Sequence, residues 1–115
     1  GAHFTTNEIA AAALTRSGRF VEPMYKPADS ALIRELALRG RTRRGGRMIP
    51  SDRFVETLRA LKRNGIVLYA PDQRFEGDGA IVVPLFGVPA ASNPGTTFVA
   101  RATKCAVLPY FARRL

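Results

Sequence analysis

The segment LKRNGIVLYAPD, residues 61–72, decides the fold. Its first residues end a helical pattern, because Asn64-Gly65 is a typical helix stop and the basic residues before it complement the negative end of the helix dipole. IVLYA, residues 66–70, is an unbroken apolar run of strand length, as expected of a strand covered on both faces. A helix that leads directly into such a strand indicates an α/β protein.

The same alternation of helices and strands continues on both sides of this segment. Strands are also expected at residues 19–25, 80–86 and 105–111, and helices at residues 8–16, 29–39, 95–104 and from Ser51 or Asp52 to Asn64. Pro23 is expected to place the first strand at a sheet edge or to bend it, because proline cannot donate a ladder hydrogen bond. The predicted fold class is α/β and layered, with a largely parallel sheet flanked by helices.

The second expected helix, residues 29–39, is amphipathic. Its apolar residues recur at helical spacing on one face: Leu32, Ile33, Leu36 and Ala37. Glu35 and Arg39 stand four residues apart and are expected to form an exposed ion pair worth ~0.3 kcal/mol. Residues 40–50 are typical of a loop or a frayed helix end.

Length and composition indicate that the chain forms one compact domain. The chain has 115 residues, and its 46 % hydrophobic content argues against global disorder. Cys105 is the single cysteine, so no disulfide forms within one chain, which fits a reducing compartment. A lone cysteine and a lone histidine give no convincing zinc spacing, and no metal site is expected. No unbroken apolar stretch approaches the ~20 residues needed to cross a bilayer.

The charge balance predicts an anionic partner. Eighteen basic residues against nine acidic ones give a net charge of +9. Such a surface attracts nucleic acid, an anionic membrane, a phosphorylated lipid or an acidic carrier protein, and charge alone does not choose among them. A small basic nucleic-acid-binding module is therefore one alternative. Against it, the aromatic residues lie mostly in apolar runs and do not alternate with arginines as stacking platforms.

HFTTNE, residues 3–8, contains the candidate acid–base pair. If His3 and Glu8 both lay in one helix, five steps of about 100° would place them on different faces. The pair works if His3 lies in the loop before a helix and Glu8 lies in its first turn, where a capping residue at 5–7 would start it. Glu8 would then orient the imidazole and stabilise its protonated form. The plain alternative is a surface histidine beside a helix-start glutamate.

Two other features are candidate binding residues. RGRTRRGGR, residues 39–47, holds five arginines and three glycines, and guanidinium groups suit bidentate contacts to phosphate. Asp72 follows a strand and a proline, at the carboxyl end of a strand where open α/β sheets place ligands. It is expected to position Arg74, an arginine of the basic segment, or the substrate. The alternatives are a solvated basic loop and a turn-forming aspartate.

Taken together, these segments resemble the late acyltransferases of lipid A biosynthesis, the lauroyl/myristoyl type of Gram-negative bacteria. HFTTNE resembles that family's H-x4-D/E motif, and YKP at 25–27 with RGRTRRGGRMI at 39–49 resembles its Y-[RK]-P…GR-x-R…M segment. LKRNGIVLYAPDQRF at 61–75 and VVPLFGVPAASNPGTTFVARAT at 82–103 resemble its A-P-D-[HQ]-x and V-P-[LF]-F-G-x-P-A blocks. AVLPYFARR at 106–114 is similar to the strand that follows. The resemblance covers nearly the whole chain in the right order.

The resemblance implies an enzyme that transfers an acyl group to oxygen. His3 would take the proton from a hydroxyl of the lipid A precursor, Glu8 would orient His3, and the donor would be an acyl–acyl carrier protein. No bound cofactor is implied. The residues implied to bind substrate are Arg41, Arg43, Arg44, Asp72 and Arg74. The implied partners are acyl carrier protein, the lipid A precursor and an anionic membrane surface, with no nucleic acid.

The resemblance also bears on domain organisation. Residues 1–115 are expected to form a partial catalytic domain that lacks the amino-terminal membrane helix, the first core strand and the carboxy-terminal part of such enzymes. The implied location is the cytoplasmic face of the inner membrane. A further alternative is a non-catalytic fragment of a membrane enzyme, in which the same residues are present without activity.

Overall fold

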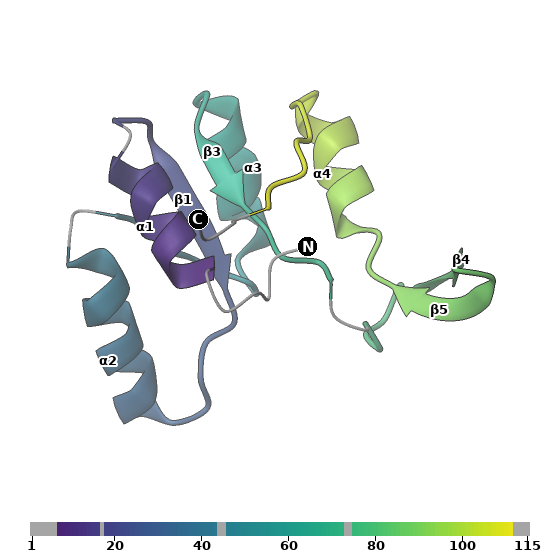
Figure 1. The fold of residues 1–115 in the computed structure, drawn as a ribbon, viewed down its shortest axis with the longest axis horizontal. Coiled ribbons are helices and arrows are strands. Elements are labelled where there is room, and N and C mark those ends of the chain that lie inside the picture. Colours follow the sequence, from purple (N-terminus) through teal and green to yellow (C-terminus); the bar gives the residue numbers. More distant parts are fainter. Residues whose placement is uncertain (1–6, 17, 44–45, 73–74, 112–115) are drawn as a thin grey trace.

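A computed structural model describes residues 7–16, 18–43, 46–72 and 75–111 (Figure 1). The elements follow one another as α1 (Asn7–Arg16), β1 (Val21–Tyr25), α2 (Ala31–Thr42), β2 (Ile49–Pro50), α3 (Phe54–Lys62), β3 (Ile66–Leu68), β4 (Ile81–Leu85), β5 (Val88–Ser92) and α4 (Gly95–Thr103). The predicted helices at residues 8–16 and 95–104 are confirmed as α1 and α4, and each ends within one residue of the expected carboxyl end. None of the described helices has the length and apolar content needed to cross a bilayer.

A three-stranded sheet in the order β2-β1-β3 forms the centre of the molecule, and both pairings are parallel. The register pairs Met24 with Ile49 on one side and Val21 with Ile66 on the other. Helix α1 packs against β1, and α3 packs against β2 and β3. The predicted α/β class, with a parallel sheet flanked by helices, is confirmed.

The apolar core of the described residues is small. Its buried hydrophobic side chains come from α1, β1, β2 and α3: Ala10, Val21, Ile49 and Ala60. Beyond it, α4 packs on α3 through Phe54 and Phe98, whose ring centroids lie 5.5 Å apart in a tilted arrangement. The core therefore sits where α1 and α3 meet the three strands, and α4 extends it along α3.

Strand β1 is the middle strand although it contains Pro23, so the expected edge position is wrong. The Phe20 carbonyl accepts a hydrogen bond from Ile66 on the β3 side, and the Tyr25 carbonyl accepts one from Ser51 on the β2 side. Because backbone groups alternate sides along a strand, Pro23 faces β2 like Tyr25. Pairing with β2 begins only at Met24, so the absent N–H of Pro23 removes no ladder bond.

Two helix starts differ from expectation. Ser30 caps α2, its side chain accepting a hydrogen bond from the Ile33 N–H, and the helix continues through Gly40 to Thr42. Neither Ser51 nor Asp52 caps α3. Arg53 occupies the cap position without a side-chain bond to the backbone, since residues 51 and 52 form the turn that leaves β2. The expected Glu35–Arg39 pair is present at 2.7 Å.

The carboxy-terminal half departs most from expectation. Residues 80–86 were expected in the main sheet, but β4 pairs with β5 in an antiparallel hairpin of its own. Residues 105–111, expected as a buried strand, carry no strand, and Leu108 is 83 % exposed. An apolar run becomes a strand only where another backbone supplies partners, and no described strand pairs with this segment.

A matched pair of glycine substitutions tests the close packing of α3 on the start of β3. A Cβ at Gly65 would lie 2.8 Å from the Ala60 carbonyl oxygen, whereas a Cβ at Gly40 in α2 would meet nothing within 4 Å. Gly65→Ala should lower the free energy of unfolding by about 1–3 kcal/mol through steric strain. Gly40→Ala should raise it by about 0.5–1 kcal/mol through the reduced entropy of the unfolded chain. Urea denaturation measures the free energy of unfolding of both variants. Equal changes in Gly65→Ala and Gly40→Ala would contradict this packing.

Candidate functional site

Of the predicted acid–base pair, His3 and Glu8, only the backbone of Glu8 lies within the described structure. Helix α1 is described from Asn7 onward, and the backbone of Glu8 is helical. His3 lies outside the described residues, and the structure describes only the backbone of Glu8. The pairing of these two side chains stays a prediction.

The predicted substrate-binding residues fall in two separate places. Arg41 lies in the last turn of α2 and Arg43 caps its carboxyl end, both exposed. Asp72 lies in the segment that follows β3, also exposed. Figure 1 places the last turn of α2 and this segment on opposite sides of the sheet, so Arg41 and Asp72 are not brought together. Arg44 and Arg74 lie outside the described residues.

Asp72 lines a groove against the hairpin. The groove has a volume of about 680 Å³ and is lined by Pro71, Asp72, Leu85, Pro89, Ala90, Ala91 and Ser92. Its walls are mainly apolar, with one carboxylate, and its size lies in the range of small-ligand sites. The Phe75 N–H donates to the Ala91 carbonyl at 3.4 Å, which ties the segment after Asp72 to β5. The groove follows the carboxyl end of β3, where parallel sheets place their ligands.

Asn93 shapes the turn that follows the hairpin, and the Tyr69 hydroxyl lies close to this turn. The Asn93 side chain accepts a hydrogen bond from the Gly95 N–H at 2.8 Å, which turns the chain from β5 into α4. A Cβ at Gly95 would lie 2.9 Å from the Asn93 Oδ1 and 3.2 Å from the Tyr69 hydroxyl, so only glycine fits there without a shift. Burial raises the pKa of Tyr69, so its phenol stays protonated at neutral pH.

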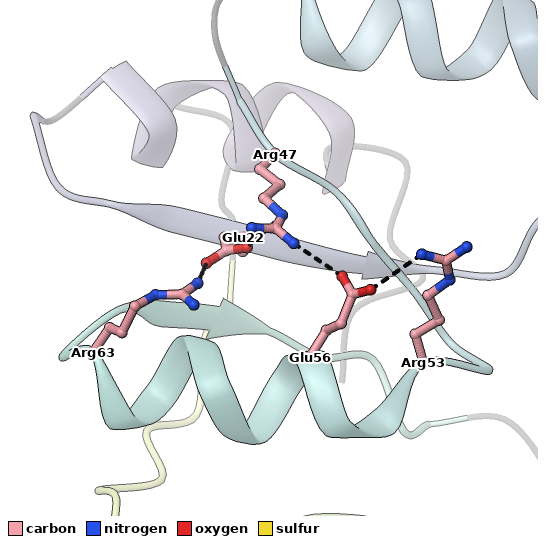
Figure 2. Close-up of polar contacts among 5 residues, drawn as sticks. All are labelled: Glu22, Arg47, Arg53, Glu56 and Arg63. Atoms are coloured by element: carbon pink, nitrogen blue, oxygen red, sulfur yellow. Dashed lines mark hydrogen bonds and ion pairs between the residues drawn. The ribbon is translucent and has the colours of Figure 1, made fainter.

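The most developed polar cluster in the described residues was missed by sequence reasoning (Figure 2). Glu22 on β1 is 1 % exposed, and its two carboxylate oxygens meet Arg47 at 3.4 Å and Arg63 at 3.2 Å. Arg47 also donates to Glu56 at 3.1 Å, and Glu56 accepts a further hydrogen bond from Arg53 at 3.2 Å. We call these five residues the Glu22 network. It joins β1, both ends of α3 and the chain that leads into β2.

Parallel register explains how the Glu22 network forms. Because Met24 pairs with Ile49, two steps back along each strand bring Glu22 level with Arg47. The turn at the end of α3 leads straight into β3, beside β1, and places Arg63 against the same carboxylate. The sequence offered one signal, a lone acid in the strand Val21–Tyr25, but its partners depend on a register that no local pattern reveals.

The geometry of the described residues does not identify a protein family, but comparison with known proteins does. Residues 1–115 match the family described as "Bacterial lipid A biosynthesis acyltransferase". The chain belongs to this family. The resemblance found in its motifs is thereby confirmed.

Among the relatives of this acyltransferase family member is the lipid A biosynthesis lauroyltransferase of Escherichia coli (strain K12). It is 35 % identical over 118 residues, covering 99 % of this chain and 37 % of the relative. The lipid A biosynthesis palmitoleoyltransferase of the same strain is 30 % identical and covers 94 % of this chain and 35 % of the relative. A lipid A biosynthesis acyltransferase of Haemophilus influenzae is 30 % identical over 87 % of this chain. The chain thus spans about a third of the length of these relatives.

Removing the cations around Glu22 should cost far more stability than breaking a surface pair. Arg47→Met with Arg63→Met leaves a buried carboxylate without a counter-charge and should lower the free energy of unfolding by about 3–5 kcal/mol. Glu22→Gln should cost less, about 1–2 kcal/mol, because Arg47 and Arg63 are half-exposed and water can solvate them. Arg39→Met, in the exposed pair with Glu35, is the control and should cost less than about 0.5 kcal/mol. Urea denaturation measures the free energy of unfolding of all three variants. Similar losses in the three would contradict a stabilising role of the Glu22 network.

Glu56 should make stability depend on pH in the acid range. Hydrogen bonding from Arg53, assisted by Arg47, lowers the pKa of Glu56, although desolvation opposes the shift. The carboxylate therefore contributes fully above the unfolded-state pKa, about 4.3, and loses its contribution as pH falls through the lower folded-state value. The stability difference between the protein and Glu56→Gln should be constant above about pH 6 and shrink below about pH 4. A difference that grew on acidification would contradict the direction of this shift.

Proposed function

We propose that the protein transfers a fatty acyl group from an acyl–acyl carrier protein to a hydroxyl of a lipid A precursor. The carrying observation is the family match over residues 1–115, with relatives named as lauroyl- and palmitoleoyltransferases of lipid A biosynthesis. The interpretation as a basic nucleic-acid-binding module rests on charge alone and loses support beside a match of this length.

His3 is the proposed general base and Glu8 the residue that orients it. Support comes from the H-x4-E spacing of the motif and from the helical backbone of Glu8 in α1. An imidazole that gains a proton is stabilised by an adjacent carboxylate, which also fixes the tautomer that accepts the proton. Carboxylates are also favourable at the positive, amino-terminal end of a helix.

The proposed reaction is a single exchange of acyl acceptors. The hydroxyl oxygen attacks the carbonyl carbon of the thioester while His3 takes the hydroxyl proton. The tetrahedral intermediate then collapses, the carbon–sulfur bond breaks, and the imidazolium returns the proton to the departing thiolate. The products are an ester on the lipid A precursor and the free thiol of the carrier protein. No metal or bound cofactor takes part in this scheme.

The basic residues near the end of α2 are the proposed contacts to anionic substrate groups. Arg41 and Arg43 are exposed, and Arg44 follows them in the chain. Phosphates of the lipid A precursor, the phosphopantetheine arm and the acidic surface of the carrier protein all suit guanidinium groups. Asp72 and Arg74, which follow β3 in the sequence, are further proposed substrate contacts. The proposed location is the cytoplasmic face of the inner membrane.

Substitution of the proposed base tests this scheme in the intact protein. His3→Ala should lower kcat for acyl transfer from acyl–acyl carrier protein by about 10²–10⁴-fold, the usual contribution of a general base. Glu8→Gln, which keeps the size and removes the charge, should lower kcat by a smaller factor. Both variants should unfold at the same temperature as the parent protein. Turnover that is unchanged in His3→Ala would exclude His3 as the base.

A further inference from the structure

Three helices end at one edge of the parallel sheet. Helices α1 and α3 lead through short turns into β1 and β3, so their carboxyl ends lie at the amino ends of these strands. Helix α4 packs on α3, and Figure 1 shows both helices ending at the top of the molecule, where the chain also turns from α1 into β1. We call the surface formed by residues 16, 18–20, 59–65 and 101–104 the amino edge. The groove beside Asp72 lies at the opposite edge of the sheet, after the carboxyl end of β3.

The amino edge carries cations and no acidic residue. Its basic residues, all exposed, are Arg16, Arg19, Arg59, Lys62, Arg63, Arg101 and Lys104. Within the described parts of the chain, Arg63 alone among these cations forms an ion pair, and its partner Glu22 is buried in β1. Exposed acids instead follow the carboxyl ends of the three strands: Asp29, Asp52, Asp72, Glu76 and Asp78. Charge is therefore segregated, with a cationic surface at the amino ends of the strands.

The helix dipole explains only part of this charge. Cations in the last turn of a helix are favoured by the negative end of its dipole, which accounts for Arg16, Arg59 and Arg101. It does not account for Arg19, which lies in the turn between α1 and β1. Lys104 caps α4 with φ of +57°, in the left-handed region that glycine or asparagine usually takes at a helix end. A lysine held in this conformation indicates a role for its side chain outside the helix.

An exposed aromatic ring lies among these cations. Phe20 is 59 % exposed and follows Arg19. A Cβ at Gly65, in the turn between α3 and β3, would lie 3.6 Å from the Phe20 ring, so this ring lies between the ends of α1 and α3. Protein–protein interfaces are enriched in aromatic residues and arginine. Single-stranded nucleic acid is instead bound by several rings on which successive bases stack, and the amino edge offers one. The amino edge therefore suits an acidic protein.

Helix α4 connects the amino edge with the groove. It begins directly after the turn at Asn93, beside the groove residue Ser92, and ends at the amino edge. Its nine residues span about 14 Å at the helical rise per residue. An extended phosphopantetheine arm is longer than this helix. A carrier protein bound at the amino edge can therefore place its thioester at the groove.

We propose that the amino edge is the docking surface of the acidic carrier protein, with the phosphopantetheine arm running along α4 to the groove. This deepens the proposed function, on which it rests for the identity of the partner. It separates the carrier protein from the phosphate groups of the acceptor, whose proposed contacts lie near the end of α2. Complementary charge of this kind mainly speeds association and is weakened by salt.

Two donors with the same acyl group test the docking in the intact protein: acyl–acyl carrier protein and acyl phosphopantetheine, which lacks the protein. Arg59→Glu and Arg101→Glu, at the ends of α3 and α4, are compared with Arg34→Glu, an exposed control on α2. All three substitutions change the net charge equally. Each edge variant should raise KM for the carrier-protein donor about tenfold and leave kcat and the constants for acyl phosphopantetheine unchanged. The control should change none of these constants.

A direct binding measurement makes the test independent of catalysis. The Kd of a fluorescently labelled carrier protein without an acyl group should rise about tenfold in Arg59→Glu and Arg101→Glu and stay constant in Arg34→Glu. In the parent protein the same Kd should rise with salt.

Two results would overturn the proposal. An equal rise of Kd in all three variants would mean that only the total charge matters. Unchanged binding of the carrier protein in both edge variants would mean that it docks elsewhere, and a loss of binding to RNA or to anionic vesicles in the same variants would assign the amino edge to that partner. If the parent protein binds the carrier protein at the amino edge but transfers no acyl group, the proposed function fails and the docking stands.

Discussion

A carboxylate buried in the middle strand of the sheet connects that strand with α3 and with the chain that leads into β2. Glu22 contributes its backbone to β1 and its side chain to Arg47 and Arg63, which come from the chain before β2 and from the end of α3. With only four hydrophobic side chains buried, the described residues rely on such contacts more than a protein with a larger core would. A buried anion is tolerated only when cations and hydrogen bonds compensate its lost hydration. The position of the segment 46–50, which ends the basic stretch, follows from this requirement.

Local sequence was sufficient for the elements and insufficient for their partners. The presence of α1 and α4 and the stop at Asn64-Gly65 follow from apolar spacing and helix-stop residues, which act within a few residues. The edge position expected from Pro23 failed because the outcome depends on which neighbouring strand begins where. The same reason explains β4, which pairs with β5 rather than with the sheet, and residues 105–111, which pair with no described strand. Pairing is a property of the assembled backbone, and a single run of apolar residues does not encode it.

The candidate site, like the fold, was predictable from local sequence only in part. Motif order along the chain was enough to identify the family, whereas the pairing of Glu8 with His3 stays a prediction. The grouping of Arg41 with Asp72 could not be judged from spacing, since the two follow different strands and lie on opposite sides of the sheet. Arg47 belonged to the predicted basic cluster, yet it is engaged by Glu22 and Glu56 and so serves the fold. Clusters of like charge in a sequence can separate into structural and binding members once register is set.

Pro84 and Pro89, which pair with each other in the hairpin β4–β5, have a consequence for the solution behaviour of the protein. An uncharged apolar stretch with valine, isoleucine and phenylalanine has much of the composition of segments that form cross-β fibrils. Growth of a fibril requires each edge to accept the next chain through regular N–H donors. Pro84 and Pro89 interrupt that row on both strands at once. The hairpin can therefore keep its hydrophobic side chains exposed during synthesis and folding with a low tendency to polymerise.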